Sequence, residues 1–209
     1  MTVAEGRRPS SETEALIRRE ARRIFNEKGY HGMTLRAVAS SVGIEAQSLY
    51  NYTRSKEDLV ISLMREGTIA IQSAVDAAIA RADATPTAML RAAMVAHTKF
   101  YCDRELVMLV RDGLVHLGPD GRADLLVLLK KYENTFKQII RAGISAGDFR
   151  PVDVTPAAFA MLGMGESVVN WYRKGDRLTS GEVAKIYSDL AVNALLTRPS
   201  RGEAQPRIL

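Results

Sequence analysis

The sequence has one cysteine, seven prolines and no long apolar run, and these shortages exclude several classes of protein. Cys102 has no partner for a disulfide within the chain, which favours a reducing compartment. No segment approaches the roughly 20 consecutive apolar residues that a membrane-spanning helix needs. Residues 1–10 contain arginines but no following apolar region, unlike a secretory signal. We therefore expect a cytoplasmic protein with no membrane partner.

Motifs of enzyme chemistry are also missing. There is no glycine-rich phosphate loop, no His-Glu-x-x-His and no Cys-x-x-Cys. Combinations such as His97 with Asp103 and Glu105, or His116 with Asp120, have spacings that match no standard metal site. The sequence therefore predicts no catalytic residues, no metal and no cofactor.

What the sequence does have is the composition of a helical protein. Apolar residues make up 46% and charged residues 25% of the 209 residues, as in ordinary globular domains. Glycine and proline occur at intervals, and the stretches between them are rich in Ala, Leu, Val, Lys, Arg and Glu, which favour helix. We predict an all-α protein of about nine helices.

Residues 34–56 are the most informative segment, because they predict two short helices joined by a glycine. Thr34 can cap the first helix by accepting from backbone N–H groups two or three residues on. Gly43 suits a sharp corner, because glycine enters the left-handed region without steric cost. An apolar stripe at helical spacing lies between them: Leu35, Val38, Ala39 and Val42. Helix, turn, helix is the plan whose second helix enters the DNA major groove.

The flanking residues extend this pattern on both sides. Upstream, Ile17, Ala21, Ile24 and Phe25 lie on one helix face, and Lys28-Gly29 is expected to end that helix. Downstream, Ser55 followed by Asp58 is a helix start resembling a capping box, and this helix is expected to run to about Arg81.

Over residues 13–66 the sequence resembles the N-terminal domain of TetR-type transcriptional regulators. The matching elements are Ile24-Phe25, Gly29-Tyr30, Thr34-Leu35, Val38-Ala39, Val42-Gly43-Ile44, Leu49-Tyr50 and Ser55-Lys56-Glu57-Asp58-Leu59. Thr53 stands where the family usually has phenylalanine, and Glu45 where a Ser or Thr cap is usual. The resemblance implies a homodimeric, sequence-specific DNA-binding regulator. It would be a repressor that a small-molecule effector releases from a near-palindromic double-stranded DNA operator.

The resemblance also assigns DNA contacts by position. Thr34 and Lys56 would hold phosphates, and Gln47 and Ser48 would reach base edges, where glutamine can pair with adenine. Tyr50 and Tyr52 match further contact positions, Arg36 and Asn51 are expected to make lesser contacts, and Ala46 stands where the family often has Lys or Arg.

The expected organisation is a flexible arm at 1–12, the DNA-binding domain at 13–66, a ligand-binding and dimerisation domain at 67–197 and a flexible tail at 198–209. In the second domain we expect helices at 87–102, from Asp103 to near Leu117, at 122–146, at 155–174 and from Thr179 or Ser180 onward. Residues 118–121 (Gly-Pro-Asp-Gly) are expected to form a loop.

The second domain is more loosely similar to TetR members that regulate fatty-acid or steroid catabolism, several of which respond to acyl-CoA thioesters. This similarity rests on residues 141–150 and 163–190. Methionine-rich helices can line a pocket for an acyl chain, although methionine also serves as core filler. The predicted pocket residues are Met89, Met94, His97, Tyr101, Met108, Met164 and Trp171.

The last two helices carry the expected dimer interface, for which internal core is the alternative reading. Its predicted residues are Phe159, Leu162, Val169, Ile186, Leu190 and Ala194. Other functions left open are a multidrug-type or ligand-independent regulator of the same fold, or a helical enzyme or binding protein in which the N-terminal motif is incidental.

Overall fold

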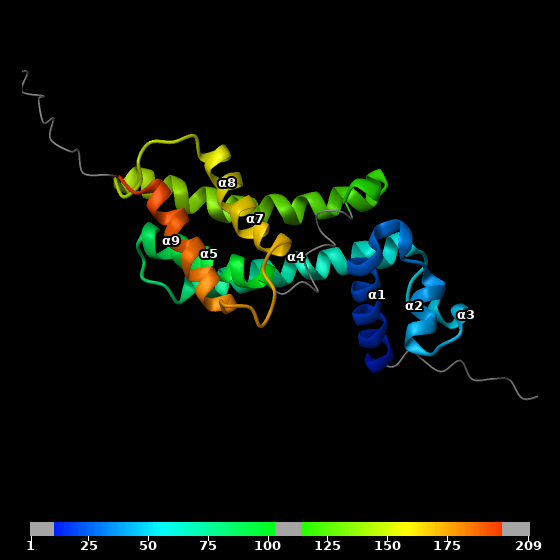
Figure 1. Ribbon diagram of the computed structural model, residues 1–209. Coiled ribbons are helices and arrows are strands. Elements are labelled where there is room, and N and C mark those ends of the chain that lie inside the picture. The colour runs from blue at the N-terminus through cyan, green and yellow to red at the C-terminus, as the bar shows by residue number, and fades with distance from the viewer. Residues whose placement is uncertain (1–10, 103–113, 198–209) are drawn as a thin grey trace, which may run out of the picture.

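The computed structural model describes residues 11–102 and 114–197, which form eight α-helices and two short 3₁₀ helices with no strand among them (Figure 1). The all-α prediction is therefore confirmed. Within these residues, no helix is long and apolar enough to cross a bilayer. The predicted arm and tail fall almost entirely outside the described residues. So does the helix expected after Asp103, apart from its end, where the 3₁₀ helix η1 (Leu114–His116) lies.

Four helices build the N-terminal end of the molecule: α1 (Ser11–Gly32), α2 (Leu35–Val42), α3 (Ala46–Leu49) and the first turns of α4 (Lys56–Ala80). Figure 1 shows α1, α2 and α3 gathered at one end of α4. Their shared core contains the predicted apolar faces, with Ile17, Phe25, Val38, Leu49 and Leu63 at 1% exposure or less.

The predicted caps of these helices are confirmed. The Thr34 hydroxyl accepts from the Ala37 N–H at 3.1 Å, and the Ser55 hydroxyl accepts from the Asp58 N–H at 3.0 Å. Gly43 ends α2 with φ 76°. Gly29 also has positive φ, 66°, but it kinks α1 where we expected the helix to end, and a further helical turn reaches Gly32.

The larger part of the molecule consists of α4, α5 (Pro86–Cys102), α7 (Pro119–Ala146), α8 (Val154–Glu166) and α9 (Ser180–Leu195). Helix α5 is central, because it packs against α4, α7, α8 and α9. The core includes Leu90, Met94, Phe136, Ile140 and Phe149, all at most 1% exposed.

Two predictions about this part are wrong. Residues 119–121 are not a loop: Pro119 occupies the first turn of α7, where its missing N–H would lack a helical partner in any case. The helix expected to reach residue 174 ends at Glu166 and continues only as the 3₁₀ helix η2 (Ser167–Asn170). There the Ser167 hydroxyl donates to the Met164 carbonyl at 2.7 Å.

The start of α7 belongs to the N-terminal core. Leu117 and Leu125 are buried against the same cluster as Leu63, and the Gly118 N–H donates to Glu57 Oε1 at 2.7 Å. At Gly121, a Cβ atom would come within 2.3 Å of Ile61 Cδ1, so glycine permits the close approach of α7 to α4. Helix α4 is thus common to both proposed domains.

Candidate DNA-binding and effector sites

The short helix α3 presents its polar residues outward. Leu49 is fully buried and anchors the helix, while Gln47 is exposed and Tyr50 is 53% exposed. No side-chain cap bond forms at Glu45. Thr53, the other departure, is buried and donates to the Ser55 carbonyl at 2.8 Å.

The predicted DNA-contact residues lie on one continuous stretch of the chain around this helix. Thr34, Arg36, Gln47, Tyr50 and Asn51 are exposed. The half-buried members of the predicted set are Ala46, Ser48, Tyr52 and Lys56.

Lys56 also has a structural role that the sequence did not suggest. Its ammonium donates to the Tyr30 carbonyl at 3.0 Å and lies 4.1 Å from the centre of the Tyr30 ring. These contacts tie the start of α4 to the end of α1. An ammonium has three N–H groups, so its proposed phosphate contact is compatible with this bond. The Tyr30 ring also stacks on His116 of η1, with 4.7 Å between ring centres.

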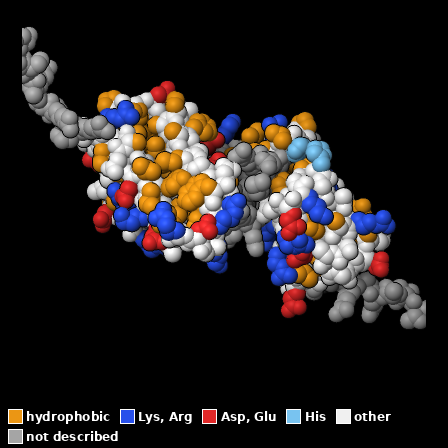
Figure 2. All heavy atoms as spheres, viewed as in Figure 1, with side chains coloured by type: hydrophobic (Ala, Val, Ile, Leu, Met, Phe, Trp, Pro, Cys, Tyr) orange, Lys and Arg blue, Asp and Glu red, His pale blue; other side chains and the backbone are white. Residues whose placement is uncertain are grey.

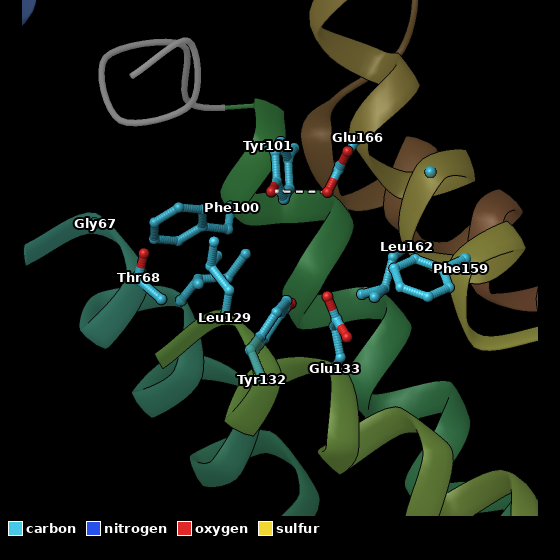
Figure 3. Close-up of a pocket in the computed structure, with 12 residues that line it drawn as sticks. Gly67, Thr68, Phe100, Tyr101, Leu129, Tyr132, Glu133, Phe159, Leu162 and Glu166 are labelled. Atoms are coloured by element: carbon cyan, nitrogen blue, oxygen red, sulfur yellow. Dashed lines mark hydrogen bonds between the residues drawn. The ribbon is translucent and has the colours of Figure 1, made fainter. Parts of the chain in front are cut away.

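A cavity of about 340 Å³ lies between α4, α5, α7 and α8 (Figure 3). Its volume is at the lower end of the range for small-molecule sites in proteins. The wall is mostly apolar, and each of the four helices contributes at least one polar side chain to it. Its described lining residues are Gly67, Thr68, Ile71, Phe100, Tyr101, Leu129, Tyr132, Glu133, Phe159, Leu162, Gly163 and Glu166.

Behind this wall His97 is fully buried and hydrogen-bonded at both ring nitrogens. Nε2 lies 3.0 Å from the Leu162 carbonyl oxygen and Nδ1 lies 2.6 Å from the Tyr132 hydroxyl. Burial lowers the pKa of His97 to about 4, so the ring is neutral at pH 7. Gly165 makes room for it, because a Cβ there would stand 2.2 Å from His97 Cδ2.

Tyr101 and Glu166 face each other from α5 and α8, and Figure 3 shows the bond between them. The Tyr101 hydroxyl donates to Glu166 Oε1 at 3.2 Å. Burial raises the pKa of Tyr101 well above its usual value, and the Glu166 charge raises it further, so the phenol keeps its proton. At the rim, Lys137 Nζ lies 3.4 Å from Glu133 Oε2 and 5.1 Å from the centre of the Phe159 ring.

The predicted pocket residues do not all lie at the cavity. Tyr101 lines the cavity, whereas Met94 is fully buried in the core. Met89 and Met164 are partly buried and pack against that core. Trp171 is 45% exposed, and its indole N–H donates to the Tyr187 hydroxyl at 3.1 Å, away from the cavity. Met108 lies outside the described residues.

Sequence reasoning missed several residues of the wall, most clearly Tyr132, Glu133 and Glu166. A signal was present on α8, because the lining positions 159, 162, 163 and 166 follow the i, i+3, i+4, i+7 pattern of one helix face. Phe159 and Leu162, which lie on this face, are also among the residues that the sequence predicts for the dimer interface.

The predicted interface residues fall into two groups. Phe159, Ile186 and Leu190 are large apolar side chains that are 50%, 45% and 55% exposed, and Ala194 is also exposed. Leu162 is 6% exposed and Val169 is partly buried. Figure 2 shows hydrophobic side chains gathered on the surface of the part of the molecule that contains α5 and α9.

A second hollow, of about 680 Å³, has a basic rim formed by Lys99 of α5 together with Arg173 and Lys174 of the loop before α9. We call it the basic groove. Tyr172 lines this groove and packs in a small cluster with Val168 and Val183, against which Tyr101 of the cavity also packs. This cluster therefore contains a residue of the groove and contacts a residue of the cavity.

Comparison with known proteins agrees with this architecture. Residues 17–63 match the family described as bacterial regulatory proteins, tetR family. Residues 83–195, more than half of the chain, match the tetracyclin repressor-like C-terminal domain. The chain therefore belongs to the tetR family of transcriptional regulators, in which operator DNA is the partner and a homodimer is the typical assembly.

Individual relatives support the same assignment. The transcriptional repressor KstR2 of Rhodococcus jostii is 27% identical over 182 residues, which cover 82% of this chain and 85% of KstR2. A solved tetR-family protein from Rhodococcus RHA1 is 26% identical, with a TM-score of 0.83 over 91% of this chain and 100% of that one. AibR, solved with isovaleryl coenzyme A and operator DNA, is 25% identical, with a TM-score of 0.78 over 88% of this chain and 98% of AibR.

Proposed function

We propose that this chain is a homodimeric repressor that an apolar small molecule releases from a near-palindromic operator. It would act in the cytoplasm and catalyse no reaction. The observation that carries the proposal is the position of the cavity. Gly67, Thr68 and Ile71 of α4 line it, and the same helix begins at the DNA-binding module. Residues 13–66 would form that module and 67–197 the effector and dimerisation domain.

Helix α4 would couple the two sites. Thr68 lies twelve residues, or about 18 Å of helix, from Lys56 at its start. A shift of α4 at the cavity would therefore move the tie between Lys56 and Tyr30 and change the spacing of the two recognition helices in the dimer. The effector can do this only by binding the released state more tightly than the DNA-bound state.

In the operator complex, Gln47 and Ser48 would read base edges while Thr34 and Lys56 hold phosphates. The substitution Gln47→Ala is expected to relax sequence preference at one base position per half-site, with a loss of about 1–3 kcal/mol of discrimination. Lys56→Ala is the contrasting variant, expected to weaken binding to all sequences alike. Selection of binding sites from a random DNA pool measures both. An unchanged site preference for Gln47→Ala would show that another residue reads the base.

For the effector we propose a lipid-like molecule, with acyl-CoA thioesters as the first candidates. AibR was solved with isovaleryl coenzyme A, and this chain resembles it over nearly its whole length. The apolar cavity would take the acyl chain. Phosphates would lie at the basic groove, where Arg173 offers a planar fork that matches phosphate oxygens.

This proposal predicts that thioesters release DNA. In an anisotropy titration with labelled operator, some acyl-CoA esters are expected to displace the protein, while CoA alone and the free acids are not. Coupling energies between such sites are typically 1–3 kcal/mol, so a decrease in DNA affinity of about 5- to 150-fold is expected. Release by unrelated apolar drugs with no response to thioesters would indicate a multidrug-type sensor instead. Unchanged DNA affinity with every compound would indicate a ligand-independent regulator.

A further inference from the structure

Glu45 carries a negative charge at the place where the DNA-binding module is expected to meet a polyanion. It is the residue before α3, its backbone is extended with φ −64° and ψ 141°, and its side chain is exposed. Figure 1 shows α3 at the outer edge of the N-terminal end of the molecule. A carboxylate near phosphates lowers DNA affinity unless the DNA offers it a hydrogen-bond donor.

The protein itself gives this carboxylate no structural role. It makes no hydrogen bond or ion pair with the residues that the structure describes, and it does not cap α3. Glutamate is not among the residues that favour the N-cap position. The neighbouring Ala46 brings no cation, and the fully buried Leu49 anchors the helix instead. The Glu45 carboxylate is therefore free to act on a partner outside the chain.

Its position places Glu45 close to the base contact proposed for Gln47. The N-terminal residues of a recognition helix are the ones that contact base edges in the major groove. Consecutive Cα atoms are about 3.8 Å apart, so those of Glu45 and Gln47 lie within about 8 Å of each other. Successive base pairs are about 3.4 Å apart along the duplex. A base that Glu45 contacts should therefore lie within about two base pairs of the one that Gln47 contacts.

Cytosine is the base whose major-groove edge suits a carboxylate. Its N4 amino group donates there, whereas guanine presents two acceptors and thymine presents O4 and a methyl group. Adenine also donates from N6, but its N7 acceptor lies beside that amino group and would repel the carboxylate. A carboxylate at this position therefore selects for cytosine and against the other three bases.

We propose that Glu45 is a specificity-determining residue that accepts a hydrogen bond from the N4 amino group of one cytosine in each half-site of the operator. Sites without this cytosine would be rejected, because the carboxylate would then face an acceptor or be left without a partner. The proposal rests on the proposed function in one respect, that α3 enters the major groove of an operator. The contact is made by the side chain, and the backbone N–H groups of α3 take no part in it.

Selection of binding sites from a random DNA pool by the full-length protein tests this, followed by affinity measurements on single-base variants of the selected site. The natural protein is expected to prefer cytosine by about tenfold or more at one position per half-site, as a hydrogen bond to a charged group provides. This position should lie within about two base pairs of the one at which Gln47→Ala relaxes the preference.

Two variants connect the preference to the carboxylate. Glu45→Gln keeps the size of the side chain but removes its charge, and a glutamine amide can pair with adenine. The cytosine preference is therefore expected to fall below about threefold, with adenine gaining at the same position. Glu45→Ser should show no base preference there. Asp83→Asn is the control: it removes one negative charge from an exposed position in the loop before α5 and should keep the full preference for cytosine.

A Glu45→Gln protein that binds all sequences more tightly and keeps the natural base preferences would overturn the proposal, because Glu45 would then act only by repelling phosphates. A natural site without a cytosine preference near the Gln47 position would overturn it as well. In both cases the natural protein still selects a site, so the repressor assignment stands. If the natural protein selects no site from the pool, the proposed function fails and this inference fails with it.

Discussion

Leu190→Arg is expected to convert the dimer into monomers. Leu190 is 55% exposed in the single chain, and Ile186, one turn earlier on α9, and Phe159 on α8 are exposed to a similar extent. Large apolar side chains that cluster on a surface indicate contact with a partner. If Leu190 is buried in the dimer, arginine would place an unpaired charge there, which costs about 3–5 kcal/mol and weakens association by more than a hundredfold.

Light scattering and sedimentation at micromolar concentration measure the assembly. Leu190→Met is the matched control, because it keeps an apolar side chain of similar volume and should remain dimeric. Circular dichroism is needed to show that the arginine variant stays helical, as expected for a position with no role in the core of the single chain. A folded and dimeric Leu190→Arg protein would place the interface elsewhere.

Acidification is expected to destabilise the fold through His97. Its folded pKa of about 4 lies below the ordinary value of 6.5, so between these values the unfolded chain binds a proton that the native chain refuses. The stability that the neutral His97 ring contributes to the fold is fully present above about pH 6.5 and is lost as the pH falls to about 4. The shift corresponds to a decrease of roughly 3 kcal/mol in the free energy of unfolding.

Urea unfolding followed at pH values from 7.5 to 4.5 measures this decrease. In His97→Gln the amide can still accept from Tyr132 and donate to Leu162 but does not titrate, so the part of the pH dependence due to His97 should disappear. His116→Gln, at an exposed position, is the control for replacing a histidine outside the core. An identical pH profile for His97→Gln and the natural protein would mean that His97 takes up its proton at the same pH in the folded and unfolded chains.

The sequence predicted the DNA-binding module far better than the effector cavity. Caps and turns such as Thr34, Gly43 and Ser55 are local features, because each acts on backbone groups within a few residues, and all three were found as predicted. The cavity depends on tertiary packing. Tyr132 and Glu166 lie far apart in the chain and line one cavity only because α7 and α8 pack against α5 and against each other.

The wrong predictions also concern features that depend on tertiary packing. Methionines were expected to line the pocket from composition, yet Met94 fills the core, and composition does not show which way a helix face turns. The predicted continuation of α8 failed after Glu166, where the chain tightens into the 3₁₀ helix η2. At Gly118 the chain enters α7 directly, because Glu57 accepts its N–H from a distant helix.

The placement of Leu117 and Leu125 in the N-terminal core limits how this protein can recombine with its relatives in evolution. A crossover inside α4 that joined residues 1–66 to another effector domain would separate these leucines from Leu59 and Leu63, their partners in the cluster. Losing one such buried leucine costs about 2–5 kcal/mol, a large part of the stability of a typical domain. DNA specificity in this lineage should therefore change by substitution within α3, and not by exchange of whole N-terminal domains.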